Sequence, residues 1–196
     1  MINYLQDCST FQSEDIGLGV EHLEERKRAW LLSSWRIVID RYPVLGEKIK
    51  IGTWATSSKG IYGYRDFVIM DQEGNYLVRA ESVWFFYDTE KMIPVRVMPE
   101  DVAAYGEEEA FDLEKAPRKI AVPKEYIEGT PVTIAAHHLD TNHHVNNAQY
   151  VDIAREAVPC TKMVKEIRAD YKKAAVLGEV LIPRVTNTGK DEWTVV

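Results

Sequence analysis

The chain has 196 residues, of which 45% are hydrophobic and 28% are charged, and its formal net charge is −7. A chain of this length and composition can build a hydrophobic core as one large or two small domains, which excludes a disordered or fibrous protein. The acidic balance argues against general binding to nucleic acid or to an anionic membrane surface.

The chain has two cysteines, Cys8 and Cys160, which lie far apart and form no CxxC motif. This usage is typical of free thiols in a reducing compartment. The sequence contains no apolar run of about 20 residues and no charged-then-apolar leader. We therefore expect a cytoplasmic globular protein.

The first half predicts a long helix, a short helix and four strands, over residues 2–15, 20–28, 29–43, 48–58 and 61–88. The last of these ranges predicts a β-hairpin, because the sequence DQEGN at 71–75 supplies turn residues. Apolar residues recur at helical spacing in the first range, and Gly17 and Gly19 follow it as helix-ending residues.

Residues 99–128 are acidic and poor in β-branched residues, so we expect a short helix after Pro99 and then an extended linker. The second half repeats the plan of the first. It predicts a strand leading into a loop, one helix and three more strands, over residues 129–140, 146–158, 161–173, 178–189 and 191–196.

A helix followed by antiparallel strands, repeated twice, predicts an α+β fold with two hotdog domains, each a long helix wrapped by a curved antiparallel β-sheet. We place the N-terminal hotdog at residues 1–118, a linker at 119–130 and the C-terminal hotdog at 131–196. The two halves share no short sequence repeat, so the repetition is visible only in the order of elements.

The sequence HHLDTNHHVNNAQY at 137–150 holds four of the five histidines of the chain. Such a cluster suits a metal site, an acid–base site or a polar loop. The spacing of the histidines matches no zinc motif, and Asp140 would have to be the acidic ligand. The metal interpretation is therefore the weakest of the three.

DTNHHVNNAQY resembles the D-x-N-x-H-V-N-N-x-x-Y signature of the acyl-acyl-carrier-protein (acyl-ACP) thioesterases. The first half is also similar to that family, in NYLQD, RAWLLSSWRIVIDRYP, the GTW of 52–54, YGYRDF and ESVWFFYD. The resemblance implies a hydrolase of fatty-acid biosynthesis that cleaves the thioester between a fatty acyl chain and acyl carrier protein, without a cofactor or metal.

The chain departs from the family pattern at both ends and at one internal position. The family has a strand before the first helix and more strand after the point where this sequence stops, and both are missing from the pattern here. Plant members also carry a Glu-Cys pair after a Tyr-Arg-Arg segment, whereas DYKKAA places Ala174 and Ala175 there. A cysteine nucleophile is thus excluded at that position. We expect Cys160, outside the motif, to be a buried structural thiol.

The chemistry must therefore rest on the loop around residue 140. Asp140 is the one carboxylate of the stretch and could act as a base toward water or attack the thioester itself. His144 could orient the water or carry its proton, and Asn142 could donate to the oxyanion. Asn146 or Asn147 would cap the next helix, whose free N–H groups could also face the thioester oxygen. The alternative for Asp140 is plain turn and capping chemistry.

In the resembling family the first hotdog supplies much of the acyl pocket. Trp54 and Trp84 are candidates to line it, although aromatic strand residues are often plain core. For docking of the acidic carrier protein we identify Lys172 and Lys173, in a segment (162–173) with five basic and two acidic residues, or 5 − 2 = +3. The alternative is an ordinary solvated strand face.

Two other functions stay open. One is an acyl-CoA thioesterase of the same fold, and the other is a non-catalytic acyl-binding protein, which the alanines at 174 and 175 favour. Because a tandem pair of hotdogs can pack its two helices within one chain, we expect a monomer or a homodimer.

Overall fold

The computed structural model describes residues 1–114, 116–117 and 119–196. The chain divides into two compact units. Unit 1 comprises Met1–Ala116 with Val164–Asp170, and unit 2 comprises Pro117–Met163 with Tyr171–Val196. The domain boundaries proposed from the sequence, at 118 and 130, remain a prediction.

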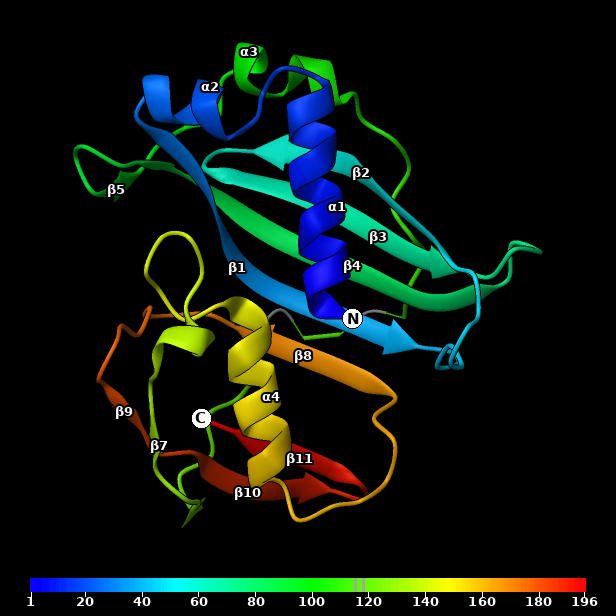
Figure 1. Cartoon of the computed structure of the whole chain (residues 1–196), viewed down its shortest axis with the longest axis vertical. Coiled ribbons are helices and arrows are strands. Elements are labelled where there is room, and N and C mark those ends of the chain that lie inside the picture. The colour runs from blue at the N-terminus through cyan, green and yellow to red at the C-terminus, as the bar shows by residue number, and fades with distance from the viewer. Residues whose placement is uncertain (115, 118) are drawn as a thin grey trace. The chain divides into compact units, whose positions relative to one another are not determined.

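Unit 1 is a helix lying on a broad antiparallel sheet (Figure 1). The strand order is β2-β3-β4-β1-β8, with the short β5 paired to β4. Its elements are α1 (Ile2–Asp15), α2 (Val20–Glu25), β1 (Arg28–Ile39), β2 (Lys50–Lys59), β3 (Tyr62–Met70), β4 (Tyr76–Asp88), β5 (Ile93–Pro94), α3 (Pro99–Val102), the 3₁₀ helix η1 (Ala103–Tyr105) and β8 (Glu166–Asp170).

Local chemistry sets the turns of unit 1 where the sequence predicts them. Helix α1 ends at Asp15 and Gly17 follows with a φ of 73°, a conformation that glycine adopts without steric cost. The β3–β4 hairpin turns at Asp71, whose carboxylate accepts hydrogen bonds from the backbone N and the side-chain amide of Asn75. The predicted helix and hairpin are therefore confirmed.

The core of unit 1 includes one face of its sheet and the buried side of α1. Phe67, Ile37 and Leu5 have no exposed surface. The row Asp66–Glu81–Arg36 crosses β3, β4 and β1 at directly opposed positions, so these three side chains share a face. Phe67 and Ile37, each one residue further along its strand, lie on the opposite face.

Unit 2 has one helix and two small sheets (Figure 1). The strand orders are β11-β10-β6 and β7-β9. Its elements are β6 (Ile127–Glu128), β7 (Val132–Thr133), the 3₁₀ helix η2 (Ala136–His138), α4 (Asn147–Ala157), β9 (Val180–Leu181), β10 (Arg184–Gly189) and β11 (Glu192–Val195). Its buried core is Ile134, Val145 and Ala175, against which Leu139, Tyr150, Ile153 and Leu181 pack.

Three predicted strands differ from those observed. The strand expected over 129–140 is only β7, because the chain then turns into η2, where His138 Nδ1 accepts from Ala135 N at 3.0 Å. The strand expected over 178–189 is two strands, β9 and β10, separated by Ile182 and Pro183; proline lacks the N–H that a continuous ladder needs. The strand expected over 161–173 is only β8.

The pairing of β8 also differs from the prediction. It was expected among the strands of the second half, but it pairs with β1 from Ser34↔Asp170 to Val38↔Glu166 and so belongs to unit 1. Within the described residues, no helix combines the length and the apolar content needed to cross a membrane.

Candidate functional site

The stretch around Asp140 forms a tight hairpin-like loop that leads directly into α4. Leu139 and Val145 form a β-bridge at its base. Asp140 N donates to His144 O at 2.8 Å, and His143 N donates to Asp140 O at 3.1 Å. His143 has a φ of 61°, so the loop is a turn followed by a left-handed residue, a common way to close a three-residue hairpin loop.

The Asp140 carboxylate is held by the backbone of its own loop. Its Oδ1 accepts from Asn142 N at 2.8 Å and from His144 N at 3.2 Å. The side chain is half-buried. Two amide donors on one oxygen fix the orientation of the carboxylate, and no hydrogen bond to Oδ2 is recorded within the described residues. One oxygen is thus anchored while the other is available to a water molecule or substrate.

Asn142 and His144 are exposed in the same loop, and no side-chain hydrogen bond is recorded for either within the described part of the chain. His144 also forms a β-bridge with Val176. His143 is exposed as well, so the two neighbouring histidines do not alternate between a buried and an exposed position. The carboxylate, the amide and the imidazole therefore stand in one loop of unit 2, and their catalytic roles remain a prediction.

The loop ends at the N-terminus of α4. Asn146 is the N-cap, and its side chain accepts from Ala148 N at 2.8 Å. Its own backbone N donates to His138 O at 2.9 Å. For Asn147 N, no acceptor is recorded among the residues that the structure describes. The capping expected of Asn146 or Asn147 falls to Asn146, and Asn147 N is left as a donor at the positive end of the helix.

Two tyrosines border the loop. Tyr150 Oη accepts from Ala175 N at 2.7 Å, and Tyr171 Oη donates to Asn147 O at 3.0 Å. Burial raises the pKa of Tyr150, the carboxylates of Glu179 and Asp140 raise it further, and the bond from Ala175 N opposes them. Burial likewise raises the pKa of Tyr171, with a further contribution from Tyr150. Both phenols therefore stay neutral at ordinary pH.

At the position where plant members of the resembling family have cysteine, this chain has Ala175, which packs in the core of unit 2. Ala175 is 5% exposed and belongs to the core of unit 2, and its carbonyl accepts from Val145 N at 2.9 Å. Ala174 is exposed. Neither side chain can take or give a proton. Cys160 is half-buried, whereas a buried thiol was expected, and both cysteines are free.

Beside the loop, unit 2 has a cavity of about 480 Å³ between the stretch around η2 and one side of α4. His137 and His138 line it, with ring centroids 4.0 Å apart, and Asp152 and Glu156 line it from the helix. Both histidines belong to η2. Among the described residues, no three His, Cys, Asp or Glu side chains come together to form a metal site.

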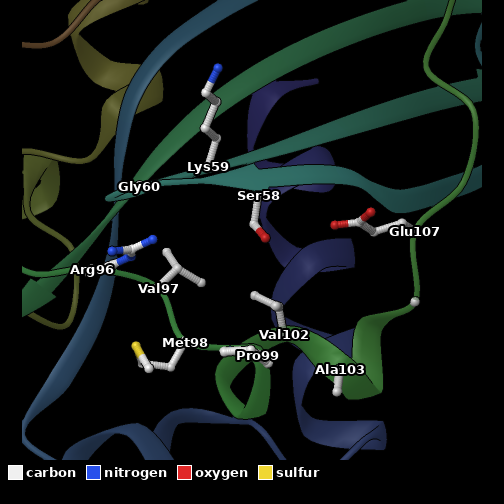
Figure 2. Close-up of a pocket in the computed structure, with 11 residues that line it drawn as sticks. Ser58, Lys59, Gly60, Arg96, Val97, Met98, Pro99, Val102, Ala103 and Glu107 are labelled. Carbon is white, nitrogen blue, oxygen red and sulfur yellow. The ribbon is translucent and has the colours of Figure 1, made fainter.

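Unit 1 holds a larger groove, of about 710 Å³, formed by the β2–β3 turn, α3 and the segments on either side of it. Figure 2 shows Ser58, Val97, Val102 and Glu107 directed toward this space, while the Lys59 side chain points away from it. Glu107 is the single carboxylate of its lining. The rest of the lining combines apolar residues of α3 and its flanking segments with the basic residues Lys59 and Arg96.

The two tryptophans proposed for the acyl pocket lie on opposite faces of the sheet of unit 1. Trp54 opposes Asp66, which in turn opposes Glu81, so Trp54 shares a face with Glu81. Trp84 is three residues beyond Glu81 on β4 and so points to the other face. Trp54 Nε1 donates to Glu109 O at 3.0 Å, and Trp84 Nε1 donates to Ser82 Oγ at 2.7 Å.

The basic segment 162–173 is dispersed in the structure. Lys162 Nζ lies 2.6 Å from Asp191 Oδ1, and Lys173 Nζ lies 3.8 Å from Glu179 Oε1. Lys165 and Arg168 belong to unit 1 with β8. Lys172 and Lys173 are both exposed. The acids of the segment, Glu166 and Asp170, also belong to unit 1, so three lysines stay in unit 2, two of them near acidic residues outside the segment.

Sequence reasoning missed three contributors to this site, the hydroxyls of Tyr150 and Tyr171 and the backbone of Ala175. Tyr150 was expected only to pack on the buried helix face, and Tyr171 and the backbone of Ala175 received no role. Tyr150 closes the motif that carries the family resemblance, whereas Tyr171 stands in DYKKAA, the segment that departs from the family pattern. Their hydrogen bonds could not be found from the sequence, because the partners are backbone atoms 24 and 25 residues away.

Comparisons with known proteins fit this arrangement. The family model of the acyl-ACP thioesterase N-terminal domain matches residues 1–105, and that of the C-terminal domain matches residues 123–193. A chloroplastic dodecanoyl-[acyl-carrier-protein] hydrolase from Cinnamomum camphora is 25% identical over 96% of this chain and 54% of its own length. Oleoyl-acyl carrier protein thioesterase 2 from Arabidopsis thaliana is 27% identical over 97% and 58%. The chain thus spans about half the length of the curated relatives it matches.

Solved structures agree in fold. A crystal structure of an acyl-ACP thioesterase from Bacteroides thetaiotaomicron superposes with a TM-score of 0.88 and 24% identity, covering 98% of this chain and 80% of the other. A putative oleoyl thioesterase from Lactobacillus plantarum gives a TM-score of 0.86 with 24% identity, covering 97% and 77%. The predicted α+β tandem hotdog fold is confirmed. With both domain models matched in order along it, the chain belongs to the acyl-ACP thioesterase family.

Proposed function

We propose that this protein hydrolyses the thioester of fatty acyl-ACP, releasing a free fatty acid and the carrier thiol. The observation that carries the proposal is the Asp140 carboxylate, with Oδ1 anchored by two backbone amides and Oδ2 open, in a loop that also holds Asn142 and His144. Family membership and the names of the relatives, which are acyl-ACP hydrolases and thioesterases, support the substrate class.

The roles follow from the groups available. Water attacks the thioester carbonyl carbon while Asp140 accepts a proton from it, and His144 orients the water or relays that proton. The developing oxyanion takes hydrogen bonds from the Asn142 side chain and from Asn147 N at the start of α4. The C–S bond then breaks, and the proton returns to the leaving thiolate.

A second route uses the same carboxylate as a nucleophile. Asp140 would attack the carbonyl carbon and expel the thiol, leaving a mixed anhydride that water hydrolyses. Single-turnover reactions in ¹⁸O-labelled water separate the two. In the general-base route, label enters only the fatty acid. In the nucleophilic route, water that attacks the Asp140 carbonyl carbon of the anhydride leaves its label in Asp140, and the fatty acid of the first turnover departs with an unlabelled carboxylate oxygen. Water that attacks the acyl carbon labels the fatty acid, as in the general-base route. Label in Asp140, with an unlabelled fatty acid in the first turnover, therefore marks nucleophilic attack by this residue.

The first test is thiol release from acyl-ACP by wild type and Asp140→Asn. Asparagine keeps an oxygen that can accept from both loop amides but cannot take a proton, so we expect activity to fall about 10²–10⁴-fold with the fold intact. Asp7→Asn, an exposed position on α1, is the matched control and should retain wild-type activity. An Asp140→Asn enzyme as active as wild type would refute the assignment.

Carrier preference is tested in the same assay. A panel of acyl-ACP and acyl-CoA substrates of equal chain length separates the proposed enzyme from an acyl-CoA thioesterase. The alanines at 174 and 175, which have no acid, base or nucleophile, favour a non-catalytic acyl-binding protein as the second candidate. Binding of acyl-ACP without any thiol release by a folded wild-type protein would select that candidate.

For carrier docking we propose Lys172 and Lys173, which are exposed in unit 2. Reversing both charges should raise KM for acyl-ACP and leave short soluble thioesters unaffected, because acyl carrier protein is acidic. Lys124→Glu with Lys190→Glu changes net charge equally at two other exposed positions and is the control. An equal rise in KM for both pairs would indicate a general charge effect instead of docking.

For the acyl chain we propose Trp54 and Trp84. Since they lie on opposite faces of the sheet, Trp54→Ala and Trp84→Ala report on different faces. Chain-length preference should change for the variant on the face that holds the chain. A monomer or homodimer and a cytoplasmic location also stay predictions, and light scattering on the purified chain tests the first of them.

A further inference from the structure

Two tyrosine hydroxyls that the proposed reaction does not use bind backbone groups next to the C-terminal end of the candidate loop. Tyr150 lies in the first turn of α4, and Tyr171 immediately follows β8. Their ring centroids are 6.0 Å apart, with the rings inclined at 64°. Each hydroxyl reaches a different backbone group beside the loop. We call these two residues the tyrosine pair.

Tyr150 reaches the loop through the neighbouring segment. Its Oη accepts from Ala175 N at 2.7 Å, and the carbonyl of the same Ala175 accepts from Val145 N at 2.9 Å. Val145 forms the bridge with Leu139 that closes the loop around Asp140. One hydroxyl is therefore separated by two hydrogen bonds from the base of the loop.

Tyr171 acts at the start of α4. Its Oη donates to Asn147 O at 3.0 Å, at the first residue of α4. The preceding residue, Asn146, caps the helix and donates its backbone N–H to His138 O. The hydrogen bond from Tyr171 thus acts on the helix start that is proposed to present Asn147 N to the oxyanion.

Both tyrosines of the pair stay protonated, so their hydrogen bonds persist over the working pH range. Burial raises the pKa of both phenols, so neither hydroxyl ionises in the range where a carboxylate base works. A neutral hydroxyl can both accept and donate. Tyr150 Oη accepts a hydrogen bond from Ala175 N and keeps its own proton. It therefore holds the segment at Ala175 without placing a second negative charge near Asp140.

We infer that Tyr150 and Tyr171 are positioning residues for the catalytic loop: they fix the segment at Ala175 and the start of α4, two stretches that adjoin the loop of Asp140, Asn142 and His144. The inference rests on the proposed hydrolase function for its kinetic consequences. Its structural content is independent of that function, because the hydrogen bonds act on the loop whether or not a substrate is cleaved.

The pair also explains how Ala175 serves the site without a reactive side chain. The small methyl group packs with Ile134 and Val145, while the N–H and C=O of the same residue bond to Tyr150 and to the loop. The backbone of this position does the positioning, and its side chain only needs to fit. A larger side chain would have to displace the core that surrounds it.

The test compares Tyr150→Phe and Tyr171→Phe with Tyr126→Phe, an exposed tyrosine of unit 2. Each change removes one hydroxyl and keeps the ring. We expect kcat for acyl-ACP to fall about 10- to 100-fold in the first two variants, with KM within twofold of wild type, since misplacing a reacting group lowers the rate more than it lowers binding. The control should keep both constants.

Backbone hydrogen exchange separates this inference from the proposed function. Tyr150→Phe should speed exchange at Ala175 and Val145, and Tyr171→Phe should speed it at residues 148–149, while amides of unit 1 keep their wild-type rates. Faster exchange without any activity in wild type would sink the hydrolase proposal and leave the positioning role standing. Unchanged exchange at these amides, or a loss of kcat fully explained by a lower folded fraction, would overturn the positioning role.

Discussion

Unit 1 and unit 2 bury their cores in different ways. In unit 1, Phe67, Phe86 and Ile37 are enclosed between a broad sheet and its helix. Among the described residues, Ile134 is the only large side chain of unit 2 that is fully buried. The strands of unit 2 are short, with two to six residues each. The unit with the lesser core carries the candidate chemistry, as expected when reactive groups stand on loops that a packed scaffold positions.

The largest expected effects come from cutting into each core. Phe67→Ala should cost about 3–5 kcal/mol of unfolding free energy, and Ile134→Ala about 2–5 kcal/mol, because each leaves a cavity that its neighbours fill only in part. Chemical denaturation gives the totals, and hydrogen exchange shows where they act. We expect Ile134→Ala to speed exchange in unit 2 alone. If Ile134→Ala speeds hydrogen exchange equally in both units, the two units unfold together and do not have independent cores.

A buried acid gives unit 1 a pH-dependent weakness. Burial, with a smaller contribution from Glu81, raises the pKa of Asp66 from 3.8 to about 6, although its hydrogen bond from Phe111 N opposes the rise. The folded state therefore holds a proton that the unfolded chain releases near pH 4. Stability contributed by this site is present below about pH 4 and is lost as pH rises through about 6.

Asp66→Asn removes that titration and keeps an oxygen that can accept from Phe111 N. After allowance for solvent screening, we expect it to stabilise unit 1 by about 1–2 kcal/mol at pH 7 and to have little effect at pH 4. Denaturation midpoints measured across pH 4–8 provide the check. A gain of the same size at every pH would show that packing, and not ionisation, is responsible.

The sequence was sufficient to predict elements whose causes are local. Alternation and turn residues placed the β3–β4 hairpin, and helical spacing with a capping asparagine placed α4. The pairing of β8 with β1 could not be predicted, because residues 34 and 170 meet only through the tertiary fold. The same limit applied to the site: Asp140 was found from its motif, while the bond from Ala175 N to Tyr150 depends on the folded arrangement.

A smaller effect is expected at the helix that follows the loop. Asn146→Ala removes the side-chain oxygen that accepts from Ala148 N and should destabilise unit 2 by about 1 kcal/mol. Asn147→Ala is the matched control, since no capping bond is made by its side chain in the described residues. Thermal unfolding followed by circular dichroism measures both. Equal losses would place the cap elsewhere and remove the reason for distinguishing these two asparagines.

The smallest effect concerns the left-handed residue of the loop. His143 has a φ of 61° and Met92, in unit 1, has a φ of 57°, a region in which a side chain costs about 1 kcal/mol or more and glycine does not. Glycine also has more freedom to lose on folding, so His143→Gly and Met92→Gly should each stabilise by only about 0.5 kcal/mol. If the catalytic loop lies in unit 2, the two substitutions will differ in their effect on kcat. Met92→Gly should leave kcat unchanged, whereas His143→Gly, which frees the turn between Asn142 and His144, should lower it even as the melting temperature rises. A kcat that is unchanged in both variants would show that the turn needs no rigidity at this residue.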